Sequence, residues 1–137
     1  MKLGVSEVLE AASQITDRNE RIRYLQVNSS VPLHTVFQGA FDPKIKWLLP
    51  EGAPPYKPND LVDQQHVFFS ECRKMYLFIE GGNNDLKPLR REALFVQMLE
   101  RLDPKDAKLL LAMKDKHIPY PGITEDVIKE AFPGLLP

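Results

Sequence analysis

Cysteine is scarce in this sequence, and its scarcity excludes two kinds of structure. The 137 residues include one cysteine, Cys72, so no disulfide can form within the chain. Zinc sites built from several cysteines are excluded for the same reason. Cys72 falls within a run of apolar residues at helical spacing, whereas a nucleophilic thiol needs exposure beside a base or a cation. We therefore predict a buried thiol that packs as a small apolar side chain.

The sequence also lacks a long apolar run and a large net charge. No uncharged stretch approaches the roughly 20 apolar residues that span a membrane. Glu7 and Glu10 interrupt the N-terminal apolar residues, where a signal peptide would be continuous. The formal net charge of −1 excludes a global field that would attract nucleic acid or an anionic membrane. We expect a soluble cytoplasmic protein that does not associate with membranes.

Hydrophobic residues, by contrast, make up 43% of the chain and recur at three- and four-residue spacing. Capping residues and prolines stand at the starts of these runs. The pattern predicts helices over residues 5–15, from Asp17 onward, from Ser30 to Phe41, over 61–80, over 88–102, from Asp103 to Lys114, and after Thr124. In the helix over 88–102, Leu89, Phe95 and Leu99 are predicted to face inward. We predict an all-α fold, an irregular bundle of six or seven short helices in a single domain spanning residues 1–137.

One segment, residues 44–60 (KIKWLLPEGAPPYKPND), departs from the helical pattern. Its four prolines exclude a regular helix and a central strand, so the segment should run extended, partly as polyproline II. Trp47 and Tyr56 make it too apolar for a free linker. We predict an ordered proline-rich strap that packs across the helical body.

No catalytic or metal-binding motif is recognisable. The three histidines, His34, His66 and His117, lie neither four residues from one another nor in an H-E-x-x-H pattern. The GGNN sequence at residues 81–84 follows a predicted helix and lacks the Gly-Lys-Ser/Thr of a phosphate-binding loop, so we interpret it as a helix-ending turn. We predict a protein that is not an enzyme and that holds no cofactor or metal.

Two long stretches and the C-terminus resemble a known family. The stretches are AFDPKIKWLLPEGAPPYKP (residues 40–58) and MYLFIEGGNNDLKPLRREALFVQMLERLDPKDAKLLLAMKDKHIPY (residues 75–120), and the chain ends in EAFPGLLP. They are similar to uncharacterised proteins encoded by tailed bacteriophages, notably the large myoviruses that infect cyanobacteria. The resemblance extends from about residue 30 onward. It implies a phage origin and a role inside an infected bacterium or in a virion, and it carries over no ligand or catalytic residue.

Lys87, Arg90 and Arg91 crowd the start of the predicted helix over 88–102. Cations there oppose the positive end of the helix dipole, which costs roughly a few tenths of a kcal/mol when they are unpaired. This placement hints at an anionic partner. The alternative is that nearby acids such as Asp85 and Glu92 pair with the cations, because surface ion pairs are common and cheap.

Arginine, tryptophan and tyrosine dominate the energy of many protein interfaces. We therefore predict a partner-binding site formed by Lys87, Arg90 and Arg91 together with Trp47 and Tyr56 of the strap. The function we expect is binding of a host or phage protein during infection, in the cytoplasm of the infected bacterium. A nucleic-acid-binding module is a less favoured alternative, because acids interleave with the basic residues. A minor component of the virion is a third hypothesis.

Overall fold

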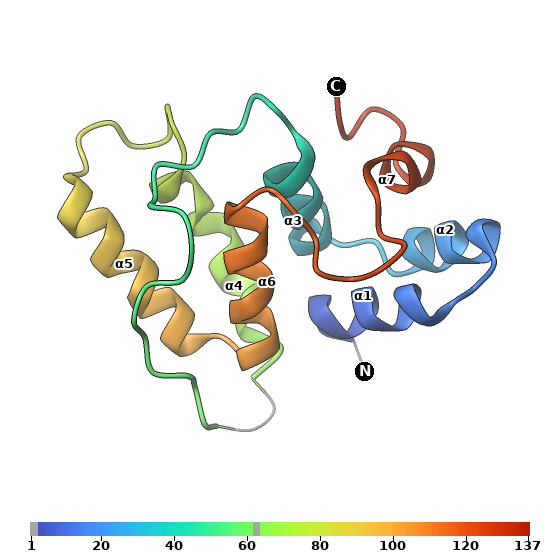
Figure 1. Ribbon diagram of the computed structural model, residues 1–137, viewed down its shortest axis with the longest axis horizontal. Coiled ribbons are helices and arrows are strands. Elements are labelled where there is room, and N and C mark those ends of the chain that lie inside the picture. Colours follow the sequence, from blue (N-terminus) through green and yellow to red (C-terminus); the bar gives the residue numbers. More distant parts are fainter. Residues whose placement is uncertain (1–2, 62–63) are drawn as a thin grey trace.

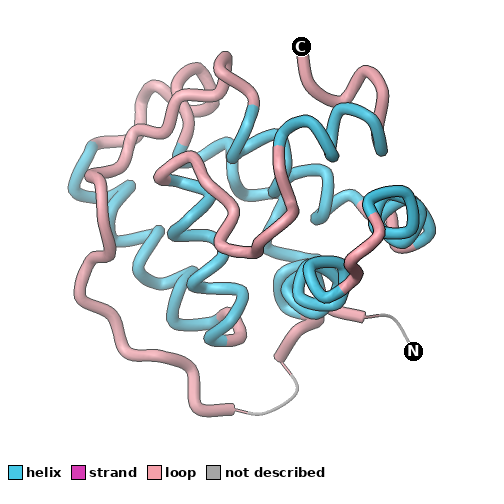
Figure 2. Tube along the Cα trace, turned by 45° about the vertical axis from the view of Figure 1, so that its right-hand side comes forward, coloured by secondary structure: helices cyan, strands magenta, loops and turns pink. Residues whose placement is uncertain are grey.

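The computed structural model describes residues 3–61 and 64–137. In chain order these residues form α1 (Val5–Gln14), α2 (Arg18–Val27), α3 (Val31–Phe41), α4 (Val67–Glu71), the 3-10 helix η1 (Cys72–Phe78), α5 (Pro88–Arg101), α6 (Pro104–Lys114) and α7 (Glu125–Ala131). Figure 2 shows helices and loops but no strand in these residues. The predicted all-α fold, an irregular bundle of six or seven short helices, is confirmed for these residues, which form seven α-helices.

The helices pack around α3 and α6, which lie against each other near the middle of the molecule (Figure 1). On one side α1 contacts both α2 and α6, and α2 packs against α7. On the other side α5 packs against α6 and η1. The N-terminal helices α1 and α2 are therefore connected to the last helix, α7, through the contact between α2 and α7.

Predicted capping residues start several of these helices. Three side chains accept a hydrogen bond from the backbone N–H three residues further on: Asp17 from Glu20, Ser30 from Leu33, and Thr124 from Val127. Such a bond satisfies one of the donors that a helix start leaves open. The local sequence thus determines where these helices begin.

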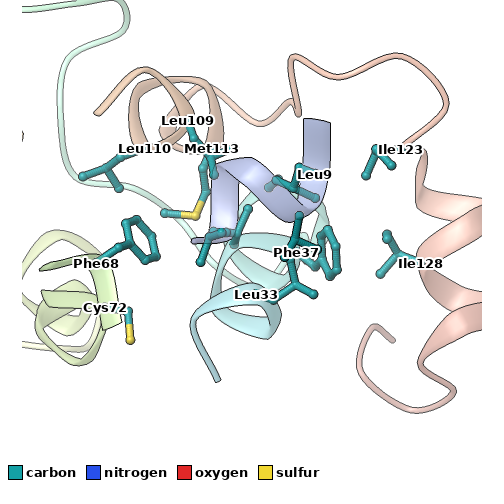
Figure 3. Packing of buried hydrophobic residues seen from close by; sticks show 14 of the residues in the cluster. Leu9, Leu33, Phe37, Phe68, Cys72, Leu109, Leu110, Met113, Ile123 and Ile128 are labelled. Carbon is teal, nitrogen blue, oxygen red and sulfur yellow. The ribbon is translucent and has the colours of Figure 1, made fainter. Parts of the chain in front are cut away.

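The apolar stripes of the helices meet in one core. Figure 3 shows side chains of α1, α3, α6 and α7 gathered in a single cluster, with Leu9, Phe37, Met113 and Ile128 among them. Cys72 belongs to the same core, so the predicted buried thiol is confirmed. Burial raises the pKa of this thiol, which favours its protonated form.

The predicted helix over 61–80 is wrong in its extent. Only α4 is α-helical, the next seven residues form η1, and residues 62 and 63 of the prediction lie outside the described residues. The backbone at Phe78 and Glu80 instead binds the strap: the Leu48 N–H donates to the Phe78 carbonyl and the Glu80 N–H donates to the Lys46 carbonyl, both at 2.8 Å. These bonds require extended backbone at Ile79, which ends the helical conformation there.

Side chains and backbone of the helices hold the strap, residues 44–60, at several points. The Trp47 indole donates to the Gly39 carbonyl of α3 at 3.0 Å, and the buried Lys114 ammonium of α6 donates to the Pro50 carbonyl at 2.8 Å. Further along, the Lys57 N–H donates to Glu100 of α5 at 2.8 Å. The strap therefore runs beside α5 from near its start to near its end (Figure 1).

The turn at residues 81–84 gives a first prediction, for Gly82. A Cβ atom at Gly82 would lie 1.9 Å from the carbonyl oxygen of Tyr76, whereas a Cβ at Gly81 meets nothing within 4 Å. Backbone atoms cannot move aside as a flexible side chain does, so Gly82→Ala should lower the free energy of unfolding by about 2 kcal/mol.

Gly81→Ala serves as the matched control. Gly81 has a φ of +86°, so alanine there is strained but meets no atom, and we expect a loss of about 1 kcal/mol. Urea denaturation of both variants measures the difference. A loss at Gly82 no greater than that at Gly81 would contradict the close approach to Tyr76.

Candidate functional site

The start of α5 presents an exposed apolar residue between two cations. Leu89 is 81% exposed, so the prediction that it faces inward is wrong. The inward stripe of α5 passes through Arg91, Phe95 and Leu99, and residue 89 lies on the opposite side of the helix from residue 91. Lys87 precedes the helix without capping it, and the first turn contains no acid.

Arg91 is not part of this exposed surface, which corrects the predicted cluster. The residue is 5% exposed. Its Nε donates to the Leu77 carbonyl at 3.0 Å, and its Nη2 donates to the carbonyls of Asn83 and Leu86 at 3.2 and 3.0 Å. The guanidinium therefore ties the turn before α5 to the end of η1. The helical period gave a signal for this burial, because Arg91 lies four residues before the core residue Phe95.

Lys87 and Arg90 remain exposed. Neither forms a salt bridge with Asp85, Glu92 or any other residue in the described ranges 3–61 and 64–137. The alternative that nearby acids pair with these cations is therefore wrong for Lys87 and Arg90 within the described residues. Two cations stand at the positive end of a helix dipole without an acid to offset them.

The strap residues of the predicted site lie at two different places. The backbone of Trp47 forms an antiparallel β-bridge with Ile79. Ile79 is two residues from Leu77, whose carbonyl accepts a hydrogen bond from Arg91 of α5. The start of the strap therefore lies close to the backbone that Arg91 binds. Both Trp47 and Tyr56 are half-buried and pack against the core. Tyr56 precedes Lys57, which binds near the other end of α5, about 20 Å from Lys87 along a helix of this length. Trp47 therefore lies near the backbone that Arg91 binds, whereas Tyr56 lies toward the other end of α5.

A pocket of about 580 Å³, which no sequence pattern indicates, lies over α1 and the start of α6. Three carboxylates line it, and each has a partner: Glu7 accepts from the Gly4 N–H, Glu10 pairs with the Lys105 ammonium at 3.1 Å, and Asp103 accepts from the Lys105 N–H. Glu7 and Asp103 are thus engaged at helix starts, and Glu10 is engaged in an ion pair between α1 and α6. Within residues 3–61 and 64–137 no group of three or more His, Cys, Asp or Glu side chains is arranged to hold a metal ion.

Asp106 is buried behind this pocket, where α6 meets α1. Its Oδ1 accepts from the Ser6 N–H at 3.3 Å. Burial raises the pKa of its carboxyl to about 6 from the ordinary 3.8, against a smaller lowering by Ser6. The local sequence shows Asp106 only as an acid in the first turn of a helix, because the partner that buries it is a hundred residues away in sequence.

One histidine lies beside a hydroxyl. The Ser29 Oγ and His34 Nε2 are 2.8 Å apart, and the imidazole packs edge-on against Phe132. A nucleophilic serine generally needs a third group that orients the base. No carboxylate of the described residues bonds to His34, so the pair has no third member there.

Comparisons with known proteins place the chain in a family without assigning an activity. No curated protein matches it, and no solved structure matches it. None of the helices in the described ranges has the length and apolar content to cross a membrane. Residues 8–119, which include most of α1 and all of α2 to α6, match DUF6433, a family of unknown function, and the chain therefore belongs to that family.

Proposed function

We propose that this protein is a non-enzymatic binding module that docks an acidic surface of a host or phage protein onto the start of α5. The observation that supports the proposal most directly is the trio of Lys87, Leu89 and Arg90. Leu89 is the most exposed large hydrophobic residue among those described, and Lys87 and Arg90, which lie close to it in sequence at the start of α5, form no salt bridge with the described residues. We name this trio the α5 surface.

The chemistry of the α5 surface favours an acidic partner. A carboxylate from a partner would offset the two cations and would also interact favourably with the positive end of the α5 dipole. Burial of Leu89 would remove apolar area from water, at roughly 25 cal/mol per Å². An apolar contact ringed by charge-assisted hydrogen bonds is the usual arrangement of a small interface.

The resemblance to phage proteins supports placing this partner in an infected bacterium. Without a global positive charge, a nucleic-acid partner has less support. Arg91 is buried, so only Lys87 and Arg90 of the predicted cluster are exposed to contact phosphate groups. Two cations are few for a nucleic-acid-binding surface, which reduces the support for that alternative further.

Charge reversal at the α5 surface tests the proposal. Affinity capture of the tagged protein from infected cells identifies the partner. The double variant Lys87→Glu with Arg90→Glu should then weaken binding at least about 30-fold in calorimetry, since interface hot spots contribute about 2 kcal/mol or more. Both side chains are exposed and form no hydrogen bond or salt bridge with the residues that the structure describes, so the variant should fold normally.

Lys108→Glu with Lys129→Glu is the matched control, because both lysines are exposed and lie on α6 and α7. It should retain the wild-type affinity. Equal binding by the two double variants would exclude the α5 surface. Capture of nucleic acid with an affinity that falls steeply with salt would favour the nucleic-acid-binding alternative, and recovery of the protein from purified phage particles by mass spectrometry would favour the virion alternative.

A further inference from the structure

We propose that Asp106 makes the docking of α1 on α6 depend on proton binding: α1 is held firmly while the Asp106 carboxyl is protonated and opens more often when it is ionised. The inference concerns a different part of the molecule from the α5 surface and does not depend on the proposed function.

The Asp106 carboxyl lies inside the contact between the two helices. Asp106 is 0% exposed and Ser6 of α1 is 1% exposed. One carboxyl oxygen, Oδ1, accepts from the Ser6 N–H, and the other, Oδ2, has no hydrogen-bond partner within residues 3–61 and 64–137. A change of charge on this group therefore acts directly where α1 rests on α6.

The charged groups around Asp106 do not compensate an ionised carboxylate. Glu7 of α1 and Asp103, the N-cap of α6, are both acids, and each raises the pKa of Asp106. Lys105, which precedes Asp106 on α6, has its ammonium paired with Glu10.

Tyr120, in the turn that follows α6, belongs to the same environment. Its pKa is raised by burial and then by Glu10, Asp106 and Asp103. No salt bridge to Asp106 occurs in the described ranges. Ionisation thus places a buried charge among other acids, which proteins normally avoid.

Proton linkage gives the direction of the effect. The docked state holds the Asp106 proton with a pKa of about 6, and a state with α1 lifted returns the carboxyl to water and to its ordinary pKa of 3.8. At a pH between these two values, Asp106 is therefore mostly protonated in the docked state and mostly ionised in the open state. Raising the pH through this window favours opening, and lowering it favours docking.

Amide hydrogen exchange tests the proposal. After correction for intrinsic rates, the opening equilibrium of the α1 amides should increase about tenfold between pH 5.0 and 7.5 in the wild-type protein. Asp106→Asn, which cannot ionise, should abolish that increase. Asp85→Asn, at an exposed turn residue, should retain it. The amides of α3 and α5 should change less than those of α1, because the opening is local.

Three results of the exchange experiment would overturn the proposal. They are a pH-independent opening of α1 in the wild type, an unchanged increase in Asp106→Asn, and an equal increase in all helices, which would indicate global unfolding alone. If Asp106→Asn does not fold, the Asp106 carboxyl can be titrated by carbon-13 NMR in the wild type. A midpoint near 6 would support the proposal, and one near 3.8 would overturn it.

Discussion

Replacing Arg91 with methionine should lower the free energy of unfolding by about 3 to 5 kcal/mol, because each hydrogen bond from a charged donor contributes about 1.5 to 3 kcal/mol. The substitution leaves the carbonyls of Leu77, Asn83 and Leu86 without their donor. Methionine keeps most of the side-chain volume, so the loss reflects the missing hydrogen bonds and not a cavity. Urea denaturation measures the change.

Arg90→Met is the matched control for that experiment. Arg90 is the adjacent residue on the same helix, but its side chain is exposed and forms no hydrogen bond or salt bridge with the described residues. Its replacement should change stability by about 0.5 kcal/mol or less. A loss of less than about 1 kcal/mol for Arg91→Met would contradict the structural role given to the guanidinium.

The contrast between Arg90 and Arg91 shows what a charge pattern in sequence can and cannot reveal. Three cations at one helix start read as a single cluster, yet one of them is 5% exposed and the other two are exposed. Arg90 and Arg91 differ in exposure because the helix turns by about 100° per residue, so adjacent side chains point in different directions. Carrying the core stripe back from Phe95 by four residues predicts the burial of Arg91, but its three carbonyl acceptors lie in a turn whose shape the sequence does not specify.

Helix starts were predictable because the interactions that create them are local. Asp17, Ser30 and Thr124 each bind a backbone N–H three residues away, and that spacing is visible in the sequence. The end of the predicted helix over 61–80 was not predictable in this way. It is determined by hydrogen bonds to Lys46 and Leu48, some thirty residues earlier, which replace the helical bonds of the same backbone.

Asp106 escaped prediction for a related reason. An aspartate three residues after a capping Asp103 fits the first turn of a helix, and nothing near it in sequence shows that Ser6 will cover it. The local sequence pattern shows only that an acid lies near a helix start, where the helix dipole stabilises it. The cost of burying the same acid depends on tertiary packing, and only the folded structure reveals it.

The strap gives the last prediction, for Trp47→Ala. The indole lies over Gly39 of α3, where a Cβ atom would come within 2.9 Å of the ring, and it donates to the Gly39 carbonyl at 3.0 Å. Removing a large aromatic side chain from a core costs about 3 to 5 kcal/mol. Because Trp47 is half-buried, we expect the lower end of that range, together with faster proteolysis within residues 44–60.

Two variants separate the contributions of the ring and the hydrogen bond. Trp47→Phe keeps most of the packing but loses the bond to the Gly39 carbonyl, so it should cost about 1 to 2 kcal/mol. Leu48→Ala removes a neighbouring side chain that is 39% exposed, and it should cost about 1 kcal/mol or less. If Trp47→Ala destabilises no more than Leu48→Ala and leaves the proteolysis rate unchanged, the strap is held by its backbone bonds to Phe78 and Lys114 and not by the indole.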